Sequence, residues 1–408
     1  MNCRNCAAQL TQTFLDLGYA PPSNAYLTKL DLCKPERYIP LRIKVCDQCW
    51  LVQTEDFATE HELFNSEYAY FSSTSSTWLE HAASYAETMI KGLSLDKNSM
   101  VIEIASNDGY LLKNFVKAGI PNLGIEPTKS TADAAEKNGI SVLREFFSLS
   151  LGKRLANQEV MADLIIGNNV YAHVPNINDF TLGLKAVLKP KGVITLEFPH
   201  LMRLIECTQF DTVYHEHYSY LSLIVVRRIF EKSGLRIWRV EKLPTHGGSL
   251  RIYGCHADNV DLGIDDSVAK IEQEEINQGL FDIQTYQNFQ SRAFHIKISL
   301  LSFLIQSKKD CKKVVAYGAA AKGNTLLNYA GIKQDLLPFV CDAAISKQFK
   351  YMPGSHIPIY PPQKMAEECP DYVLILPWNI SDEVKRELSG QLSPTTKFMV
   401  AIPDLIVL

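Results

Sequence analysis

The sequence has no excess of charge of either sign and no apolar run of membrane-spanning length. Its 41 Lys and Arg residues against 45 Asp and Glu give a formal net charge of −4, whereas a nucleic-acid-binding protein usually carries a strongly basic face. No apolar stretch approaches the roughly 20 residues that cross a bilayer, and the polar residues 1–6 lack the apolar core of a signal peptide. We therefore expect a cytoplasmic protein that binds neither nucleic acid nor membrane.

The chain also has no low-complexity segment and no convincing short repeat. Its 46% hydrophobic and 21% charged residues are ordinary for a globular protein. A length of 408 residues corresponds to two or three domains at roughly 150 residues each. Three regions differ in texture, and we expect domains over 1–66, 67–275 and 276–408. The oligomeric state, monomer or homo-oligomer, stays open.

Four of the ten cysteines form two C-x-x-C pairs, Cys3 with Cys6 and Cys46 with Cys49. Two such pairs supply the four thiolates of a tetrahedral zinc site. The intervening residues, 7–45, exceed the usual ribbon spacing of about 15–20, so they should form an inserted lobe. The alternative is one redox-active pair beside an incidental one. Four thiolates leave no open position, so we expect structural rather than catalytic zinc.

The central region alternates between short β-branched runs and helical patterns. A turn is expected at 189–192. The expected strands, the last two forming an antiparallel pair, are 100–105, 122–126, 163–167, 193–197, 235–243 and 249–255. A parallel α/β sheet closed by a late hairpin is the layout of class I methyltransferases.

A second α/β pattern follows in the C-terminal region. A strand over 313–317, a turn over 318–323 and a helix over 324–330 begin it, and strands at 336–342 and 372–376 continue it. The expected fold class is therefore α/β. A class I methyltransferase Rossmann-like sheet lies between a small N-terminal zinc-binding domain and a C-terminal Rossmann-like domain.

The turn from Glu103 to Gly109, between a strand and a helix, is the candidate cofactor loop. It departs from G-x-G-x-x-G, so a nicotinamide cofactor is disfavoured. Its acid-x-small-x-x-x-Gly pattern resembles the loop that holds S-adenosylmethionine, although Ala105 stands where glycine is frequent. An acid at the end of the next strand can accept both ribose hydroxyls. The predicted cofactor-binding residues are Glu103, Ser106, Asn107, Gly109, Glu126, Asn168 and Asn169.

Two alternatives remain for these residues. Asn168 and Asn169 follow a strand, where they would line the same crevice but where loop capping is nearly as good an explanation. The whole unit is also compatible with a nucleotide fold that has lost its ligand.

The segment from Asp211 to Tyr220 concentrates two histidines, one glutamate and three tyrosines. Methylation at carbon needs a nucleophilic carbon, and a carbon beside a carbonyl becomes one when a base removes its proton. Histidine titrates near neutral pH and suits that task, while a neighbouring donor stabilises the enolate oxygen. In an extended segment His215 and His217 share one face, so spacing alone does not choose between them. A metal at the two histidines lacks a third ligand nearby, and buried structural histidines are the plainer alternative.

The chain resembles the sugar C-methyltransferases that act on nucleotide-linked 4-keto-6-deoxy sugars. Motifs in this order carry the resemblance over essentially the whole chain: the two cysteine pairs, Glu103 to Gly109, Gly124 to Pro127, Asn168 to His173, Tyr214 to His217, His246 to Arg251 and Gly318 to Gly323. The family implies structural zinc, S-adenosylmethionine, and methylation at C3 beside the C4 ketone during deoxysugar biosynthesis, as for antibiotics and lipopolysaccharides.

The resemblance also implies roles for individual residues. His217 is the expected base, with Tyr214, Glu216 and His173 beside it and Tyr68 favoured slightly over Tyr70 as a further pocket residue. Lys322 is expected to meet a diphosphate oxygen, with a solvated lysine at a helix start as the alternative. The remaining expected substrate-binding residues are Tyr70, His215, His246, Gly247, Gly248, Ser249 and Arg251.

Three functions are compatible with these patterns. The leading one is C3 methylation of a keto sugar linked to thymidine or guanosine diphosphate, a choice that the sequence leaves open together with the sugar's configuration. The others are an RNA methyltransferase with a zinc ribbon, which the charge balance disfavours, and a non-enzymatic zinc scaffold.

Overall fold

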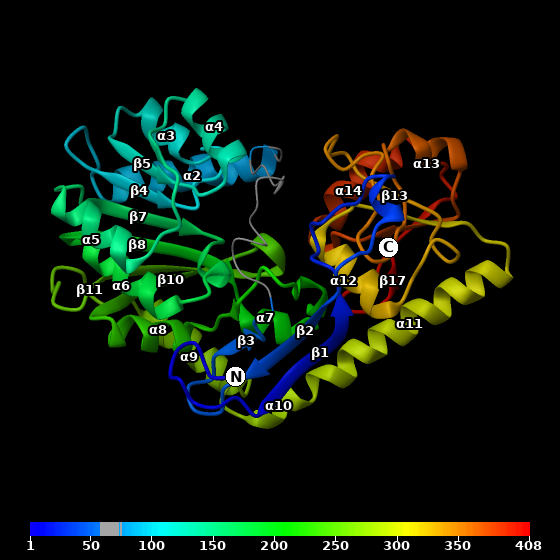
Figure 1. Ribbon diagram of the computed structural model, residues 1–408, viewed down its shortest axis with the longest axis horizontal. Coiled ribbons are helices and arrows are strands. Elements are labelled where there is room, and N and C mark those ends of the chain that lie inside the picture. The colour runs from blue at the N-terminus through cyan, green and yellow to red at the C-terminus, as the bar shows by residue number, and fades with distance from the viewer. Residues whose placement is uncertain (58–72, 74–75) are drawn as a thin grey trace.

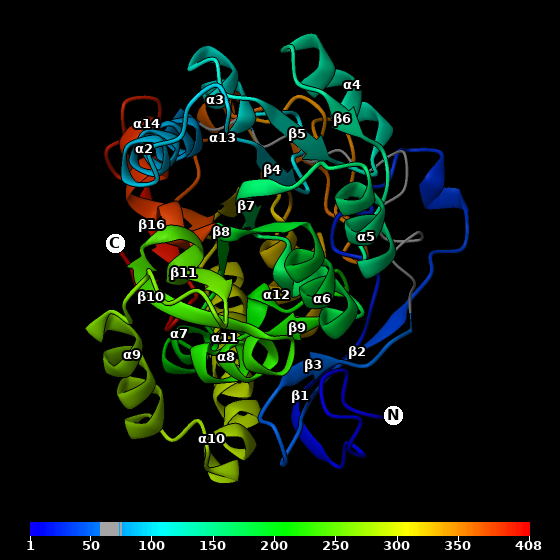
Figure 2. The same cartoon turned by 90° about the vertical axis from the view of Figure 1, so that its left-hand side faces the viewer.

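The structure is a computed structural model that describes residues 1–57, 73 and 76–408. Three sheets organise it (Figures 1 and 2). Tyr68 and Tyr70 lie outside the described residues. Within those ranges no helix is both long and apolar enough to cross a membrane.

The central sheet has seven strands in the order β10-β11-β8-β7-β4-β5-β6. The core strand β4 (Val101–Ile104) is buried at every residue and pairs in parallel with its neighbours on both sides. Such a run, apolar on both faces, is typical of parallel strands covered by helices. The other strands are β5 (Asn122–Ile125), β6 (Val142–Leu143), β7 (Ala162–Asn168), β8 (Leu188–Pro199), β10 (Leu235–Leu243) and β11 (Ser249–His256).

The helices of this central unit pack on both faces of its sheet (Figure 2). Short polar side chains start two of them, since Ser148 caps α5 and Ser222 caps α8. The helices are α2 (Ser76–Gly92), α3 (Leu112–Lys117), α4 (Lys129–Lys137), α5 (Leu149–Asn157), α6 (Ile177–Val187), α7 (Leu201–Glu206), α8 (Leu223–Lys232) and α9 (Asp266–Asn277).

The expected turn at 189–192 is wrong, because these residues belong to β8. Leu188 pairs with Ala162 and Val193 with Leu164, so the intervening residues bulge opposite Asp163. Lys189 secures the bulge by an ion pair of 2.6 Å to that carboxylate. The residues 189–192, although typical of a turn, thus form a bulge within the single strand β8.

The N-terminal sheet has four strands in the order β1-β2-β3-β9. Alternating burial along β2 follows the alternating apolar side chains of its sequence. Its fourth strand, β9, comes from the central region, directly after the Tyr-His-Glu-His segment. The strands are β1 (Gln12–Ala20), β2 (Ile39–Val45), β3 (Val52–Thr54) and β9 (Ser219–Tyr220).

The C-terminal sheet has six strands in the order β14-β13-β12-β15-β16-β17, parallel except for the last. Its strands are β12 (Val314–Tyr317), β13 (Val340–Cys341), β14 (Ile359–Tyr360), β15 (Tyr372–Ile375), β16 (Lys397–Val400) and β17 (Ile406–Val407). Its helices and those leading to it are α10 (Ile283–Gln287), α11 (Phe289–Lys309), α12 (Ala321–Ala330), α13 (Gln363–Glu368) and α14 (Ser381–Ser389). The expected fold class is confirmed, with α12 starting three residues earlier than expected.

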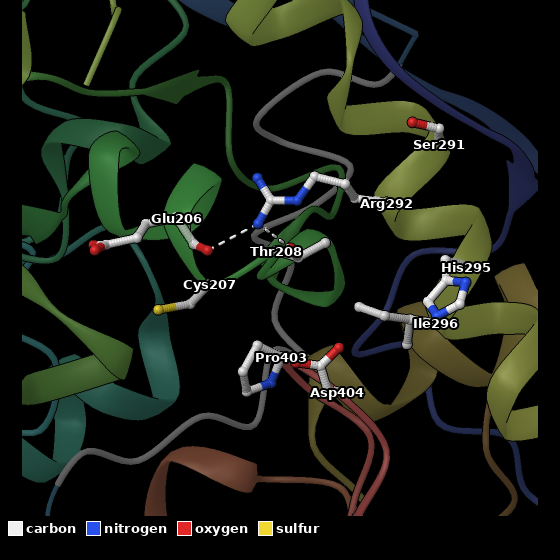
Figure 3. Close-up of a pocket in the computed structure, with 9 residues that line it drawn as sticks. All are labelled: Glu206, Cys207, Thr208, Ser291, Arg292, His295, Ile296, Pro403 and Asp404. Atoms are coloured by element: carbon white, nitrogen blue, oxygen red, sulfur yellow. Dashed lines mark hydrogen bonds between the residues drawn. The ribbon is translucent and has the colours of Figure 1, made fainter. Parts of the chain in front are cut away.

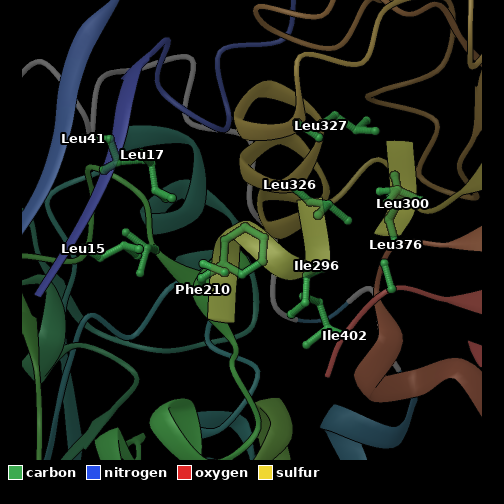
Figure 4. Packing of buried hydrophobic residues seen from close by; sticks show 14 of the residues in the cluster. Leu15, Leu17, Leu41, Phe210, Ile296, Leu300, Leu326, Leu327, Leu376 and Ile402 are labelled. Carbon is green, nitrogen blue, oxygen red and sulfur yellow. The ribbon is translucent and has the colours of Figure 1, made fainter. Parts of the chain in front are cut away.

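One hydrophobic core joins the three units. Figure 4 shows Phe210, from the central region, between Leu15 of β1 and Leu326 of α12. Because side chains from all three units share this core, the C-terminal unit is held against the segment that precedes Tyr214. The long helix α11 runs along the outside and connects the central and C-terminal units (Figure 1).

Candidate active site

The two described cavities differ in whether they contain predicted residues. A cavity of about 400 Å³ between α7, α11 and the C-terminal end of the chain contains none of them (Figure 3). There Arg292 donates hydrogen bonds to the Glu206 carbonyl and to Thr208. A larger cavity of about 540 Å³ is lined by residues of all three units, and the predicted residues on its wall are Asn107, Glu126, Asn168, Asn169, His173, Tyr214, Glu216, His217, His246 and Lys322.

The candidate cofactor loop folds tightly after β4. Ala105, Asn107 and Gly109 all have positive φ, at 56°, 50° and 77°. A Cβ on Gly109 would stand 2.2 Å from Ile140, so only glycine fits there without displacement. The close turn brings the Asn107 amide to the end of β5, where it donates to Glu126 over 3.0 Å.

Glu126 is oriented by backbone donors. Its Oε2 accepts from Asn107 N and its Oε1 from Thr128 N, at 3.0 and 2.8 Å. Burial raises the pKa of this carboxyl, and the backbone hydrogen bonds oppose the rise. Each carboxylate oxygen keeps a second lone pair, so the two oxygens can accept hydrogen bonds from two adjacent hydroxyl groups of a ligand in the cavity.

Several buried polar atoms around this loop lack hydrogen-bond partners among the described residues. They include both amide atoms of Asn168, which lines the cavity, as well as Glu103 Oε2 and Ser106 Oγ beneath the loop. Burial and the neighbouring Asp108 and Glu126 raise the pKa of Glu103 well above its usual value. A buried amide without hydrogen-bond partners lowers the stability of the fold. The Asn168 side chain is therefore suited to hydrogen-bond a polar ligand in the cavity. Glu103, Ser106 and Gly109 support the loop rather than line the cavity.

Two imidazoles meet at the wall of the cavity. His217 Nδ1 donates to the Thr212 carbonyl over 3.1 Å, and His173 Nδ1 donates to the Glu216 carbonyl over 2.9 Å. Their ring centroids are 4.6 Å apart, and Tyr214 lies 4.0 Å from His217. A donated Nδ1–H fixes the tautomer, so Nε2 carries the basic lone pair of His217.

Burial keeps these imidazoles neutral. It lowers the pKa of His173 to about 4, and it lowers the pKa of His217 well below its usual value, with His173 adding to the effect. Each ring therefore keeps an unprotonated nitrogen at physiological pH, and its lowered pKa makes it a weaker base than a free histidine. Glu216 lies beside them, and burial raises the pKa of its carboxyl.

The two histidines of the Tyr-His-Glu-His segment do not share a face. The segment turns, with the His217 amide donating to the Tyr214 carbonyl over 3.0 Å. As a result His215 points away from the cavity, and its Nε2 donates to the Ile39 carbonyl over 3.3 Å. The geometry therefore selects His217 over His215 as the side chain that meets the cavity.

The segment is held from both neighbouring units. From the N-terminal unit, Thr54 donates to the His217 carbonyl over 2.5 Å and Asn24 to Glu216 over 3.3 Å. From α12, Thr325 donates to the Val213 carbonyl over 2.9 Å. The positions of the imidazoles thus depend on all three units.

The His246-Gly-Gly-Ser segment reaches the cavity through one side chain. His246 has a φ of 56°, and its Nε2 lies 3.3 Å from the amide nitrogen of Asn169. Gly247, Gly248 and Ser249 do not line the cavity. Arg251 does not line it either, because its guanidinium is buried against Glu197, with Nε 2.7 Å from the carboxylate.

The C-terminal wall carries two ammonium groups. Lys322, in the first turn of α12, donates to Asn379 over 2.6 Å, and Lys347 donates to the Ala319 carbonyl over 2.8 Å. Both line the cavity beside Ala320, whose position before α12 has no side-chain cap. Sequence reasoning missed Lys347, because it lies 25 residues beyond Lys322 in an irregular stretch without a motif.

The four predicted zinc ligands converge. Their sulfur atoms all lie within 4.8 Å of one another, with Cys3–Cys49 and Cys6–Cys46 at 3.5 Å. Zn–S bonds of about 2.3 Å in a tetrahedron need sulfur atoms roughly 3.8 Å apart, so this donor set fits zinc. Both pairs form the same turn, since Ala7 N donates to Cys3 O and Trp50 N to Cys46 O.

Known proteins match the chain along its length. Family models match residues 3–64 as a zinc binding domain, 78–240 as a methyltransferase domain and 244–403 as a C-methyltransferase C-terminal domain. The C-methyltransferase NovU of Streptomyces niveus is 31% identical over 98% of this chain and 95% of its own length.

Solved structures match the central part with low scores. The magnesium protoporphyrin IX methyltransferase ChlM of Synechocystis, with bound SAH, matches 44% of this chain and 83% of its own at 13% identity and a TM-score of 0.36. An S-adenosylmethionine-dependent methyltransferase of Clostridium acetobutylicum matches 44% of this chain and 92% of its own at 11% identity and a TM-score of 0.36.

The two expected cofactors, S-adenosylmethionine and zinc, are confirmed. The methyltransferase and zinc binding domain models span the two units concerned, and the four thiols converge as a zinc site requires. Together with the NovU relationship over almost the whole chain, these matches show that the protein belongs to the C-methyltransferase family whose members carry an N-terminal zinc binding domain.

Proposed function

We propose that this C-methyltransferase methylates C3 of a nucleotide-linked 4-keto-6-deoxyhexose in deoxysugar biosynthesis, in the cytoplasm. One observation carries the proposal: a neutral, tautomer-fixed His217 packs against His173 and Tyr214 on the wall of the cavity that Glu126 and Asn168 also line. An imidazole nitrogen that is unprotonated at physiological pH has the lone pair needed to remove a proton from the carbon next to a ketone.

The proposed chemistry assigns a task to each group. His217 Nε2 takes the C3 proton, and the Thr212 carbonyl stabilises the imidazolium through the Nδ1–H that it already accepts. Tyr214 and Glu216, which both line the cavity, orient the sugar and stabilise the enolate oxygen. S-adenosylmethionine supplies the electrophilic methyl group that bonds to C3, and Glu126 and Asn168 are the residues that would hold it.

The C-terminal wall suits the nucleotide end of such a substrate. Lys322 and Lys347 present ammonium groups beside the uncapped first turn of α12. Backbone N–H groups at a helix start and lysine side chains both favour phosphate oxygens. A diphosphate bound there would leave the sugar beside His217, which supports a nucleoside diphosphate sugar over a free sugar.

The direct test is incubation of the protein with S-adenosylmethionine and a 4-keto-6-deoxyhexose linked to thymidine or guanosine diphosphate. We expect one of the two sugars to gain the mass of one methyl group, with the new carbon at C3 by NMR. Methylation of neither sugar, in protein that binds S-adenosylmethionine, would reject the proposed substrate.

Glu126→Gln should weaken S-adenosylmethionine binding about 10- to 100-fold. The amide keeps one acceptor oxygen, so it loses a charged hydrogen bond to hydroxyl or backbone donors, worth about 1.5–3 kcal/mol. Calorimetric titration measures the change, with Glu136→Gln, on the exposed face of α4, as the matched control. Equal affinities in the two variants would remove Glu126 from the cofactor site.

A further inference from the structure

Trp378 connects the C-terminal unit to the segment that carries the base. It follows β15 in a short 3-10 turn (Trp378–Ile380), and its Nε1–H donates to Asp211 Oδ2 over 2.7 Å. Asp211 is fully buried, and it belongs to the 3-10 turn η4 (Phe210–Thr212). No motif identified in the sequence includes Trp378.

The turn that Trp378 contacts is the one that orients His217. The residue after Asp211 is Thr212, whose carbonyl accepts the Nδ1–H of His217. The residue before it is Phe210, anchored in the shared core and 5.3 Å from the ring of Tyr329 on α12 (Figure 4). Because both ends of η4 are held by these contacts, a shift of Asp211 would move the Thr212 carbonyl and with it the imidazole of His217.

The same indole touches the second segment at the cavity. A Cβ added to Gly247 would stand 2.4 Å from Trp378 Cη2, so the ring packs directly on the His246-Gly-Gly backbone. Lys322 places its ammonium 4.6 Å from the ring centroid. Trp378 therefore contacts two of the three segments that bring histidines to the cavity, those of His217 and His246, and it does so next to a cation of the C-terminal wall.

The buried carboxylate makes this hydrogen bond consequential. Burial raises the pKa of Asp211 to about 6, while the ammonium of Lys322 and the indole N–H of Trp378 oppose the rise. Among the described residues Trp378 is the one side chain that donates a hydrogen bond to the Asp211 carboxylate, beside backbone N–H groups of Asp211 and Thr212. Without the indole N–H, Asp211 Oδ2 would be a buried acceptor that lacks this donor. The η4 turn would then move so that the carboxylate reaches a different donor.

We propose that Trp378 is a positioning residue, which uses its hydrogen bond to Asp211 to set the orientation of His217 from the C-terminal unit. The inference rests on the proposed function, in which His217 is the base. It adds a task to the C-terminal unit beyond holding the nucleotide: the unit also completes the geometry of proton abstraction. A purely structural tryptophan would affect folding without a selective effect on that step.

The test uses full-length Trp378→Phe, which keeps an aromatic ring but has no N–H donor. Hydrogen–deuterium exchange at C3 of the unmethylated keto sugar, measured by NMR without S-adenosylmethionine, reports proton abstraction separately from methyl transfer. We expect the exchange rate and kcat to fall about 10- to 100-fold, as misplaced catalytic groups do, while the affinity for S-adenosylmethionine stays at the wild-type value. An exchange rate within about twofold of wild type would overturn the inference.

Further variants separate positioning from packing. Asp211→Asn keeps an oxygen that accepts the indole N–H and should lose less than Asp211→Leu, which cannot accept it. Trp378→Phe combined with Asp211→Leu should be no slower than the slower single variant, because both remove one interaction; multiplied losses would contradict the coupling. Trp238→Phe is the matched control, since the Trp238 indole N–H has no hydrogen-bond partner among the described residues.

The outcome for the proposed function is read separately. Wild-type protein that exchanges no C3 proton of either keto sugar would reject the proposed function. Wild-type exchange with an equally fast Trp378→Phe variant would reject only the role of Trp378.

Discussion

His217→Ala is expected to slow methyl transfer about 10²- to 10⁴-fold, the usual contribution of a general base. The reason lies in the tautomer: Thr212 accepts the Nδ1–H, so Nε2 carries the lone pair, and burial keeps the ring neutral. Deuterium exchange at C3 should fall by a similar factor. The affinity for S-adenosylmethionine should stay unchanged, because other residues of the cavity wall, Glu126 and Asn168, are the ones proposed to hold it.

Comparison with His173→Ala decides which imidazole acts. His173 faces His217 at 4.6 Å between ring centroids, so it is the second candidate. If exchange survives in His217→Ala but disappears in His173→Ala, His173 is the base. His295→Ala is the control and should leave the rate unchanged, because His295 is exposed and lines the smaller cavity instead (Figure 3).

Removal of zinc should abolish activity together with the order of the N-terminal unit. Structural zinc contributes about 10–16 kcal/mol in zinc-finger peptides, which is comparable to or larger than the total stability of a typical domain. Loss of the unit would release the Thr54 and Asn24 hydrogen bonds that hold His217 and Glu216. We therefore expect Cys49→Ser to lose zinc, melt at lower temperature and lose most methyl transfer.

Metal analysis of the purified variant and a thermal melt measure this outcome. Cys33→Ser is the matched control, because Cys33 is exposed and lies outside the four-cysteine cluster. A Cys49→Ser protein with full activity after chelation would show that the zinc unit is dispensable for the catalytic segment.

Elements with local signals were predictable from the sequence. The strands at 235–243 and 249–255 agree with β10 and β11 to within one residue, because apolar alternation and the Gly247-Gly248 pair mark them locally. The cysteine pairs were also readable, since C-x-x-C spacing is set by the coordination geometry. The turn expected at 189–192 failed because its partner, Asp163, lies on another strand.

The candidate site was readable only in part, for the same reason. The sequence could not choose between His215 and His217. The orientation of each ring depends on a hydrogen bond, from His215 to the Ile39 carbonyl and from His217 to the Thr212 carbonyl, and on the turn of the Tyr-His-Glu-His segment. Lys347 and Trp378 belong to no sequence motif. Tertiary packing alone brings Lys347 to the cavity and Trp378 to Asp211 in η4. Side chains recruited across units leave no local pattern to recognise.

The membership of β9 in the N-terminal sheet bears on how such an enzyme can be rearranged by gene fusion or truncation. β9 pairs with β3 and follows the Tyr-His-Glu-His segment directly. A methyltransferase domain cut out on its own would therefore lose β3, the neighbour of β9, and expose an unpaired strand edge close to His217. A recombination point between the zinc unit and the Tyr-His-Glu-His segment would separate β9 from the other three strands of its sheet. We therefore expect the two parts to be inherited together.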